Sequence, residues 1–292
     1  MKMRKRFWIR IVILFLVLIC LSGFIGYEYY ISKHHLTVTD YAIESGKLED
    51  SVRIVQLTDL HNSEFGDGNE ELIDLVEAQH PDLIFVTGDL LNSDEERTDI
   101  AVSLLERLNV IAPVYFSYGN HEKEYEERYG EDIQALFEQT GTKVLEFGYE
   151  DITVKGQALR IGGLYGYCVP AEFLETGEAD PQECAFLSDF QDTDRYTILL
   201  CHMPHCWVEN DGISSWDIDC VFSGHIHGGQ IKLPFIGGLY APDQGFFPEW
   251  TDGLFYSKDQ NKVMVLSRGL GSTEQIPRWN NVPEVVTVDL EP

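Results

Sequence analysis

The pattern of apolar and polar positions predicts alternating strands and helices from about residue 50 onward. The run VRIVQL, the apolar residues 83–86 and the run VYFS are typical of buried β-strands. Between them, apolar positions in NEELIDLVEAQ and over residues 100–108 recur at helical spacing. Strands and helices that alternate in this order favour a mostly parallel sheet covered by helices.

The second half of the chain continues the pattern with one helix and several short strands. Residues 133–139 predict a helix, and residues 152–155 and 158–164 predict a hairpin that turns at Gly156 and Gln157. Further strands are expected at residues 196–200, 219–222, 263–267 and 285–290. Because no linker interrupts these elements, we expect residues 50–292 to form one α/β sandwich.

The first thirty residues have a different character. Basic residues precede an uncharged run at residues 11–27, and residues 7–27 are long enough to cross a bilayer core of about 30 Å. We interpret residues 1–31 as a basic flank and one uncleaved transmembrane signal-anchor, and residues 32–49 as a linker. A cleaved signal peptide is the alternative, but Ser22-Gly23 is a weak cleavage site. The basic flank favours a cytoplasmic N-terminus, so this single-pass protein of the cell membrane would carry its large domain outside the cytoplasm.

Charge divides the chain at the same place. The first thirty residues hold 5 of the 21 Lys and Arg and 1 of the 49 acidic residues. The remainder therefore has 16 basic and 48 acidic side chains, a net charge of −32. Such a surface repels long polyanions, so no nucleic-acid partner is expected and a small or locally held substrate is favoured.

Six cysteines are present, and none forms a CxxC pair, so neither a cysteine zinc motif nor a disulfide framework is indicated. Cys168 and Cys184 could pair across the loop between them or could be small buried thiols. Cys201 precedes His202 on a predicted strand, so its side chain should point the opposite way, into the core.

Metal-competent side chains follow five of the predicted strands at their carboxyl ends. These residues are Asp59, His61, Asp89, Asn120, His121, His202, His225 and His227. The first three groups are about thirty residues apart, which is the length of a βαβ unit. Because the carboxyl ends of parallel strands lie at one edge of a sheet, we expect these distant groups to meet in space.

The donors are chemically consistent with a pair of divalent metal ions. Carboxylate, imidazole and amide oxygen suit Mn, Fe or Zn, and the identity of the metal stays open. In Asp59-x-His61 and His225-x-His227 the two side chains would share one face of an extended segment. Asp89 has two oxygens and could bridge both ions. Two divalent ions carry more positive charge than two aspartates and one hydroxide neutralise, so the site would keep a net positive charge that favours an anionic phosphate. Neighbouring glycines would let the backbone turn close to the metals.

The order of these motifs resembles the calcineurin-like metallophosphoesterase superfamily across residues 50–292. The stretches that carry the resemblance are TDLHNSEFG, PDLIFVTGDLL, GNHE, GHIHGGQIKLPF and LSRGLG. They look like the bacterial membrane-anchored branch of that superfamily. The resemblance implies a two-sheet α/β/β/α sandwich preceded by the transmembrane helix.

The resemblance also implies a role for each motif residue. One metal would be held by Asp59, His61, Asp89 and His227, and the other by Asp89, Asn120, His202 and His225, with Asp89 bridging. His121 would not be a ligand and would lie near the leaving group. Glu122 follows His121 where the family often has Asp, a difference that concerns how His121 is oriented.

The leading hypothesis is a membrane-anchored, dimetal phosphoester hydrolase that acts on a phosphodiester or a pyrophosphate-linked substrate. A hydroxide bridging the two ions would attack phosphorus in line, and His121, as imidazolium, would stabilise or protonate the leaving oxygen. Lipid- and envelope-related substrates are candidates. A phosphomonoesterase is the first alternative, and a non-catalytic metal-binding scaffold or sensor is the second.

Five further residues are candidates for substrate contacts. Arg268 and Arg278 could reach a phosphate, or could form ordinary surface ion pairs. Phe246, Phe247 and Trp250 lie close together in a Pro- and Gly-rich loop. They could line a cleft for a lipid-like leaving group, dip into the nearby membrane, or fold onto the core.

Overall fold

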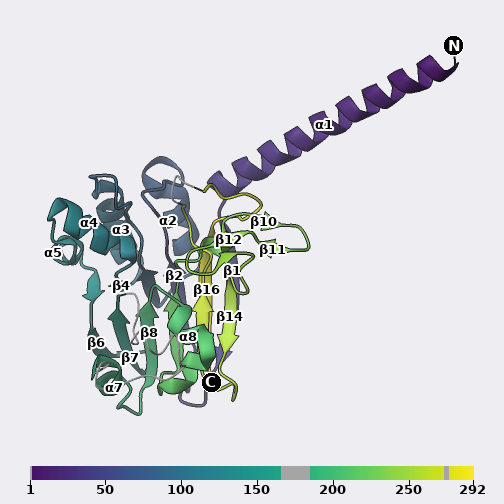
Figure 1. Ribbon diagram of the computed structural model, residues 1–292. Helices are drawn as coiled ribbons and strands as arrows, with labels where there is room; N and C mark the ends of the chain where they lie inside the picture. Colours follow the sequence, from purple (N-terminus) through teal and green to yellow (C-terminus); the bar gives the residue numbers. More distant parts are fainter. Residues whose placement is uncertain (1, 166–184, 273–275) are drawn as a thin grey trace.

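A computed structural model of the protein describes residues 2–165, 185–272 and 276–292. Cys168 and Cys184, whose pairing the sequence leaves open, lie outside the described residues. The arrangement of helices and strands is shown in Figure 1.

Two six-stranded sheets form the centre of the molecule. The first has the strand order β1 (Thr37–Glu44), β16 (Glu284–Glu291), β2 (Val52–Leu57), β3 (Leu83–Thr87), β4 (Val114–Ser117) and β5 (Lys143–Leu145). The second has the order β14 (Gly253–Tyr256), β15 (Val263–Leu266), β9 (Cys220–Ser223), β8 (Tyr196–Cys201), β7 (Gln157–Leu164) and β6 (Gly148–Val154). The strands that precede the predicted site residues run parallel to one another within each sheet, as the sequence predicts.

Helices cover the outer face of each sheet, which completes four layers. The helices α2 (Glu70–Glu77), α3 (Asp99–Ile111), α4 (Asn120–Tyr129) and α5 (Ile133–Glu138) pack on the first sheet. The second sheet is covered by α7 (Ala185–Phe190) and α8 (His205–Val208). Between the sheets lies an apolar core in which the rings of Phe85 and Phe222 meet at 5.2 Å. The expected α/β/β/α sandwich is therefore confirmed.

Short elements complete the connecting loops. Two small antiparallel pairs join β10 (Lys232–Leu233) to β11 (Gly237–Gly238) and β12 (Tyr240–Ala241) to β13 (Gly245–Phe246). Three 3₁₀ turns are described, η1 (Asp67–Asn69), η2 (Glu209–Ser215) and η3 (His227–Gly229).

The segment expected to be a linker is partly a strand. Residues 37–44 form β1, which pairs in parallel with β16 at the edge of the first sheet. Its partner lies about 250 positions away in the chain, so no local pattern pointed to the pairing. The domain described by the structure thus begins before residue 50.

The N-terminal helix α1 (Lys2–His34) projects away from the sandwich (Figure 1). Its apolar side chains are exposed, and by length and composition alone it could cross a membrane. It continues seven residues beyond the predicted span, so its last two turns lie against the domain.

Candidate metal centre

The strand ends bring all seven predicted metal ligands to one rim of the sandwich. Asp59 and His61 follow β2, Asp89 follows β3, and Asn120 begins α4 directly after β4. From the second sheet, His202 follows β8, and His225 and His227 follow β9. Donor atoms within 4.8 Å of one another form the groups Asp59–His61–His227, His61–Asp89–His121 and Asp89–His202–His225.

The backbone at these residues is not extended, which corrects one expectation. Asp59, His61, Asp89, His225 and His227 all have positive φ, between 49° and 74°. Side chains two positions apart therefore converge because the chain coils tightly past the strand end, and not because they share one face of a strand. Left-handed conformations are costly for such residues and tend to gather at functional sites.

Glycines permit the close approach of these loops. A Cβ atom on Gly119 would lie 2.5 Å from the Asp89 nitrogen, and one on Gly224 would lie 2.5 Å from Asp59 Oδ2. Neither position has space for a side chain, because each backbone packs directly against a carboxylate-bearing residue. The glycines around the histidine pair are thus explained by close packing as well as by turning.

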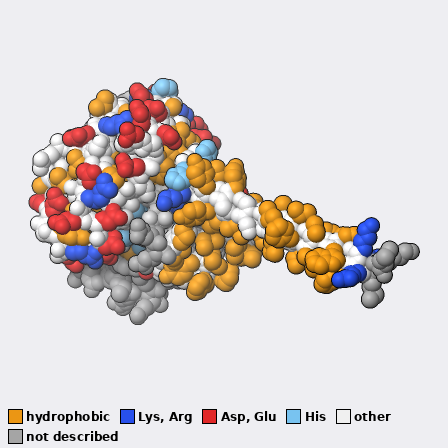
Figure 2. All heavy atoms as spheres, turned by 90° about the horizontal axis from the view of Figure 1, so that it is seen from above, with side chains coloured by type: hydrophobic (Ala, Val, Ile, Leu, Met, Phe, Trp, Pro, Cys, Tyr) orange, Lys and Arg blue, Asp and Glu red, His pale blue; other side chains and the backbone are white. Residues whose placement is uncertain are grey.

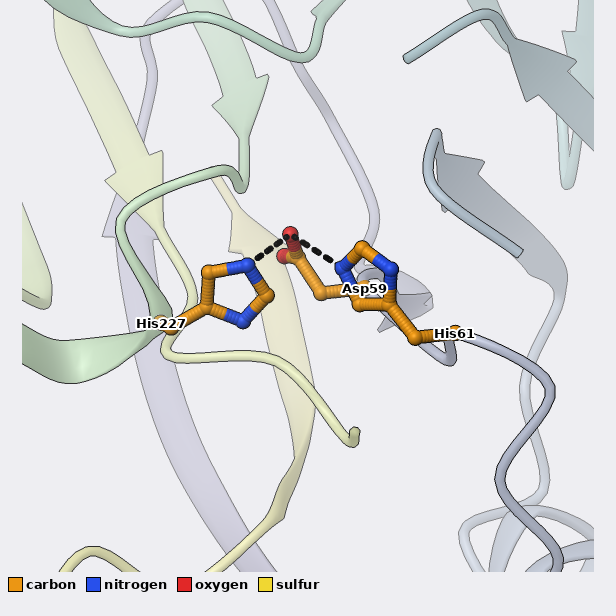
Figure 3. Close-up of side chains that lie close together, drawn as sticks. All are labelled: Asp59, His61 and His227. Carbon is orange, nitrogen blue, oxygen red and sulfur yellow. Dashed lines mark ion pairs between the residues drawn. The ribbon is translucent and has the colours of Figure 1, made fainter. Parts of the chain in front are cut away.

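Asp59 stands between two imidazoles, as Figure 3 shows. Its Oδ1 lies 3.9 Å from His61 Nε2 and 3.5 Å from His227 Nε2. The backbone N–H of His225 donates to both carboxylate oxygens at 3.1 Å. The carboxylate is therefore oriented by the opposite sheet, while both rings turn a nitrogen toward it.

Asp89 is shared by the other two groups of donors. Its Oδ2 lies 3.1 Å from His202 Nε2 and 3.7 Å from His61 Nε2, so it joins the group that contains His61 and His121 to the group that contains His202 and His225. The Nδ1–H of His202 donates to the Thr87 carbonyl at 2.7 Å. That bond holds the ring so that Nε2 is the nitrogen that points into the site.

Burial and the two carboxylates set the protonation of the rings. Burial lowers the pKa of His61 to about 3, so that ring is neutral. Burial alone would also lower the pKa of His202, but the adjacent Asp89 outweighs it and raises that pKa to about 10. Burial raises the pKa of Asp59, whereas His202 holds the pKa of Asp89 well below its usual range.

The residues fit a pair of divalent cations. Asp59 and Asp89 are almost fully buried, and the ion pairs described for them are all with histidines. Two acidic groups gathered in the interior call for positive charge nearby. Among the described residues, Asn120 Oδ1 and His61 Nε2 are buried without a hydrogen-bond partner. Such atoms are the donors that a metal ion would satisfy.

Comparison with known proteins identifies the family. The profile of calcineurin-like phosphoesterases matches residues 52–229, more than half of the chain. The chain belongs to the calcineurin-like phosphoesterase family. The resemblance seen in the motifs is confirmed, and membership makes the protein a metal-dependent phosphoester hydrolase of a family that binds two divalent metals.

Several bacterial relatives support the assignment. The Bacillus subtilis metallophosphoesterase YkuE is 28% identical over 279 residues, which cover 92% of this chain and 91% of that protein. The Campylobacter jejuni metallophosphoesterase Cj0846 is 30% identical over 85% of this chain and 62% of its own length. The Escherichia coli phosphodiesterase YaeI is 28% identical over 82% of each chain.

His121 of this calcineurin-like domain lies beside His61 and Asp89. Its ring meets that of His61 at 4.5 Å, and its backbone N–H donates to Asp89 Oδ1 at 2.9 Å. The Ser93 backbone N–H donates to Nδ1 of the ring at 3.1 Å. Because Nδ1 accepts that hydrogen bond, Nε2 is the ring nitrogen left to donate.

Glu122 does not orient His121, contrary to the expectation raised by the GNHE motif. Its buried carboxylate accepts hydrogen bonds from the backbone N–H groups of Asp89, Leu91 and Gly119 at 2.8–3.1 Å. It therefore ties the loop after β3 to the start of α4. The longer side chain reaches the Asp89 loop and bypasses the imidazole.

Two supporting residues were missed by sequence reasoning. Asn92 places Oδ1 3.2 Å from His61 Nδ1 and donates from Nδ2 to the His61 carbonyl. Asp243 lies 3.0 Å from His225 Nε2, which leaves Nδ1 of that ring to face the site. Asn92 stands three residues after Asp89 and could have been suspected, whereas nothing in the sequence marked Asp243.

The two candidate arginines have different environments. Arg268 pairs with Glu284 at 2.8 Å and donates to the Val282 carbonyl and to Thr37 Oγ1, so it joins β1 to the end of the chain. Arg278 is buried beside His61 and lines a cavity of about 510 Å³, with Nη1 lacking a hydrogen-bond partner. Burial lowers the pKa of Arg278 to about 10, which leaves it cationic at neutral pH.

The aromatic loop divides into buried and exposed parts. Trp250 is only 8% exposed and its ring meets that of His205 at 5.2 Å, so it belongs to the core under the second sheet. Placing Trp250 on a membrane or cleft surface is therefore wrong. Phe246 and Phe247 are 72% and 61% exposed. Cys201 is buried in the same core as Trp250, as expected.

Gly224→Ala should weaken metal binding about tenfold or more, because its Cβ would displace the Asp59 carboxylate. Manganese bound per chain, measured by mass spectrometry after gel filtration, would report the loss. Gly46→Ala is the matched control, since no atom lies within 4 Å of its Cβ position. Equal manganese in both variants would contradict this account of Gly224.

Metal binding at pH 7.5 should release about one proton per chain. His202 is protonated below its raised pKa of about 10, and only the neutral ring can bind a metal. Affinity should accordingly rise with pH across the neutral range. Titration calorimetry in buffers of different ionisation enthalpy measures the release, and heats independent of the buffer would refute it.

Proposed function

We propose that this calcineurin-like protein is a dimetal phosphodiesterase or pyrophosphohydrolase, anchored in the cell membrane with its active site on the outer face. The observation that carries the proposal is the convergence of seven donor residues, two of them buried carboxylates, with His121 beside them. Asp59, His61, Asp89 and His227 would hold one ion, and Asp89, Asn120, His202 and His225 the other. Mn, Fe and Zn all suit these donors.

The two ions, when bound, supply an activated water and positive charge for the phosphoryl oxygens. The chain adds a hydrogen-bond donor, because His121 is held through Nδ1 by the Ser93 N–H and can donate from Nε2. It can donate a hydrogen bond to the leaving oxygen and stabilise the negative charge that develops there as the bond to phosphorus breaks. Arg278 adds a buried cation at the edge of the same cavity, where its unpartnered Nη1 can bind a phosphate oxygen.

A diester or pyrophosphate is favoured over a monoester for two reasons. The Escherichia coli relative named a phosphodiesterase is similar over most of the chain. In addition, the cavity beside His61 continues past Asn62 and Arg278, which leaves room for a second substituent on phosphorus. The phosphomonoesterase and the non-catalytic scaffold are the competing outcomes of the assay described below.

The proposed membrane anchor and the proposed orientation of the domain rest on α1. The helix is long and apolar enough to cross a bilayer, and four of its first six residues are basic. Basic flanks remain in the cytoplasm, so the sandwich would lie on the outer side. The acidic domain supports a substrate that is small or held at the membrane, including lipid- and envelope-related phosphoesters.

The full chain, purified in detergent, stripped of metal and reloaded with manganese, should hydrolyse bis-p-nitrophenyl phosphate faster than p-nitrophenyl phosphate. Asp89→Asn should reduce turnover by at least about a thousandfold, because it removes the carboxylate that lies between His61 and His202. The rate of nitrophenol release measures hydrolysis of each substrate by the parent and by Asp89→Asn. Cleavage of the monoester alone would favour the phosphomonoesterase, and metal binding without cleavage of either would favour the scaffold.

His121→Ala should lower turnover about a hundredfold to ten-thousandfold while both metals remain bound, because the side chain acts on the leaving oxygen. The exposed His80 supplies a matched control, and His80→Ala should behave as the parent. Metal content and the rate of diester hydrolysis are measured on the same samples. Loss of a metal ion from His121→Ala would make His121 a metal ligand and not a hydrogen-bond donor to the leaving oxygen.

A further inference from the structure

The outer end of α1 forms part of the cavity beside the metal centre. Tyr29, Ser32 and Lys33 of the helix line the same space of about 510 Å³ as His61 and Arg278. Ser32 is buried, and its Oγ accepts the Asn281 backbone N–H at 3.0 Å. The helix is thus a wall of the cavity and not only a tether.

This wall lies close to the level at which the helix would leave a bilayer. The uncharged run ends at Tyr27, and residues 29–33 follow within about 10 Å along the helix axis. The polar headgroup region on one side of a bilayer is about 5–8 Å thick. The mouth of the cavity would therefore open at the depth of the headgroups.

The segment that holds the helix also carries an exposed apolar hairpin. Trp279 donates from Nε1 to the Ile25 carbonyl at 3.1 Å, and its ring meets Phe24 at 6.0 Å. On its other side, Trp279 accepts the Lys232 backbone N–H at 3.0 Å, where β10 begins. The hairpin of β10 and β11 is therefore built directly onto the base of the helix.

Four large apolar side chains are exposed on this hairpin and on the loop beside it. They are Phe235, fully exposed, Ile236 at 64%, Phe246 at 72% and Phe247 at 61%. The two loops are joined by backbone hydrogen bonds from Leu239 to Ile231 and from Phe247 to Leu239. Figure 2 shows hydrophobic side chains gathered on the domain next to the base of the helix. We name these four residues the apolar rim.

We propose that the apolar rim inserts into the outer leaflet beside α1, so that the cavity takes phosphoesters carried by lipids of that same leaflet. The inference rests on the proposed hydrolase function and adds the source of the substrate. A contiguous apolar surface marks an interaction site, and here it continues from a helix that itself needs a bilayer. The acyl chains would stay in the leaflet while the phosphate enters between Lys33 and Arg278 toward His61.

Contact with the bilayer is measured first, without reference to activity. The full chain, with Phe235→Trp, is placed in nanodiscs whose phosphatidylcholine carries brominated or ordinary acyl chains. Bromine quenches tryptophan on contact, so Phe235→Trp should show quenching beyond the parent protein. Val110→Trp is the control, because Val110 is 86% exposed on α3, outside the apolar rim. Equal quenching of both variants would overturn the proposal.

Use of the surface in catalysis is measured with two diesters. In nanodiscs, the double variant Phe235→Ser/Ile236→Ser should hydrolyse membrane-embedded p-nitrophenyl hexadecyl phosphate about tenfold more slowly than the parent. Its rate on water-soluble bis-p-nitrophenyl phosphate should be unchanged, and Val110→Ser should match the parent on both. An equal loss on both probes, or no loss on either, would overturn the proposal.

The two proposals fail in different ways. If the parent hydrolyses neither diester while Phe235→Trp is quenched, the apolar rim contacts the bilayer and the hydrolase assignment is wrong. If the soluble diester is cleaved and Phe235→Trp is not quenched, the hydrolase assignment stands and the membrane-seated cavity is wrong.

Discussion

The structure of this site depends on the burial of two carboxylates, Asp59 and Asp89, at one rim of the sandwich. Removing an ionised carboxylate from water costs roughly several kcal/mol even after the protein relaxes. Part of that cost is offset by backbone N–H donors, from His225 to Asp59 and from His121 to Asp89. The remainder requires positive charge, which metal cations bound among the four facing histidines would supply.

The demand for this arrangement explains local features that are otherwise unfavourable. Loops from both sheets must approach one another closely around the two carboxylates. Five donor residues therefore adopt a left-handed backbone conformation, and two glycines pack against the carboxylate residues. Glu122 then holds three backbone N–H groups of the two loops that meet around Asp89. Asn92, Asp243 and the Thr87 carbonyl each fix one imidazole, so the rings are oriented before any metal arrives.

The same rim is joined to the base of the N-terminal helix α1. The segment around Trp279 contacts the base of α1, carries the β10–β11 hairpin, and lies next to Arg278 in the chain. The helix α1, the apolar rim and the buried Arg278 are therefore parts of one continuous structure. In a hydrolase built in this way, the position of the active site at the bilayer would select substrates more than the shape of the pocket does. Phosphoesters carried by lipids are concentrated at the bilayer, whereas esters dissolved in water are not.

The sequence by itself determined the alternation of strands and helices, the strand ends and the set of candidate donors, with His121, that gathers at one rim. Buried strands and the residues after them leave local patterns of apolar and polar positions. It did not show that residues 37–44 form an edge strand, that Asp243 supports His225, or that Trp250 is buried while Phe235 is exposed. Nor did it separate Arg268, which pairs with Glu284, from Arg278, which faces the cavity. Each of these depends on contacts with segments distant in sequence or on the packing of irregular loops. No local periodicity encodes such contacts, so only the tertiary structure could decide them.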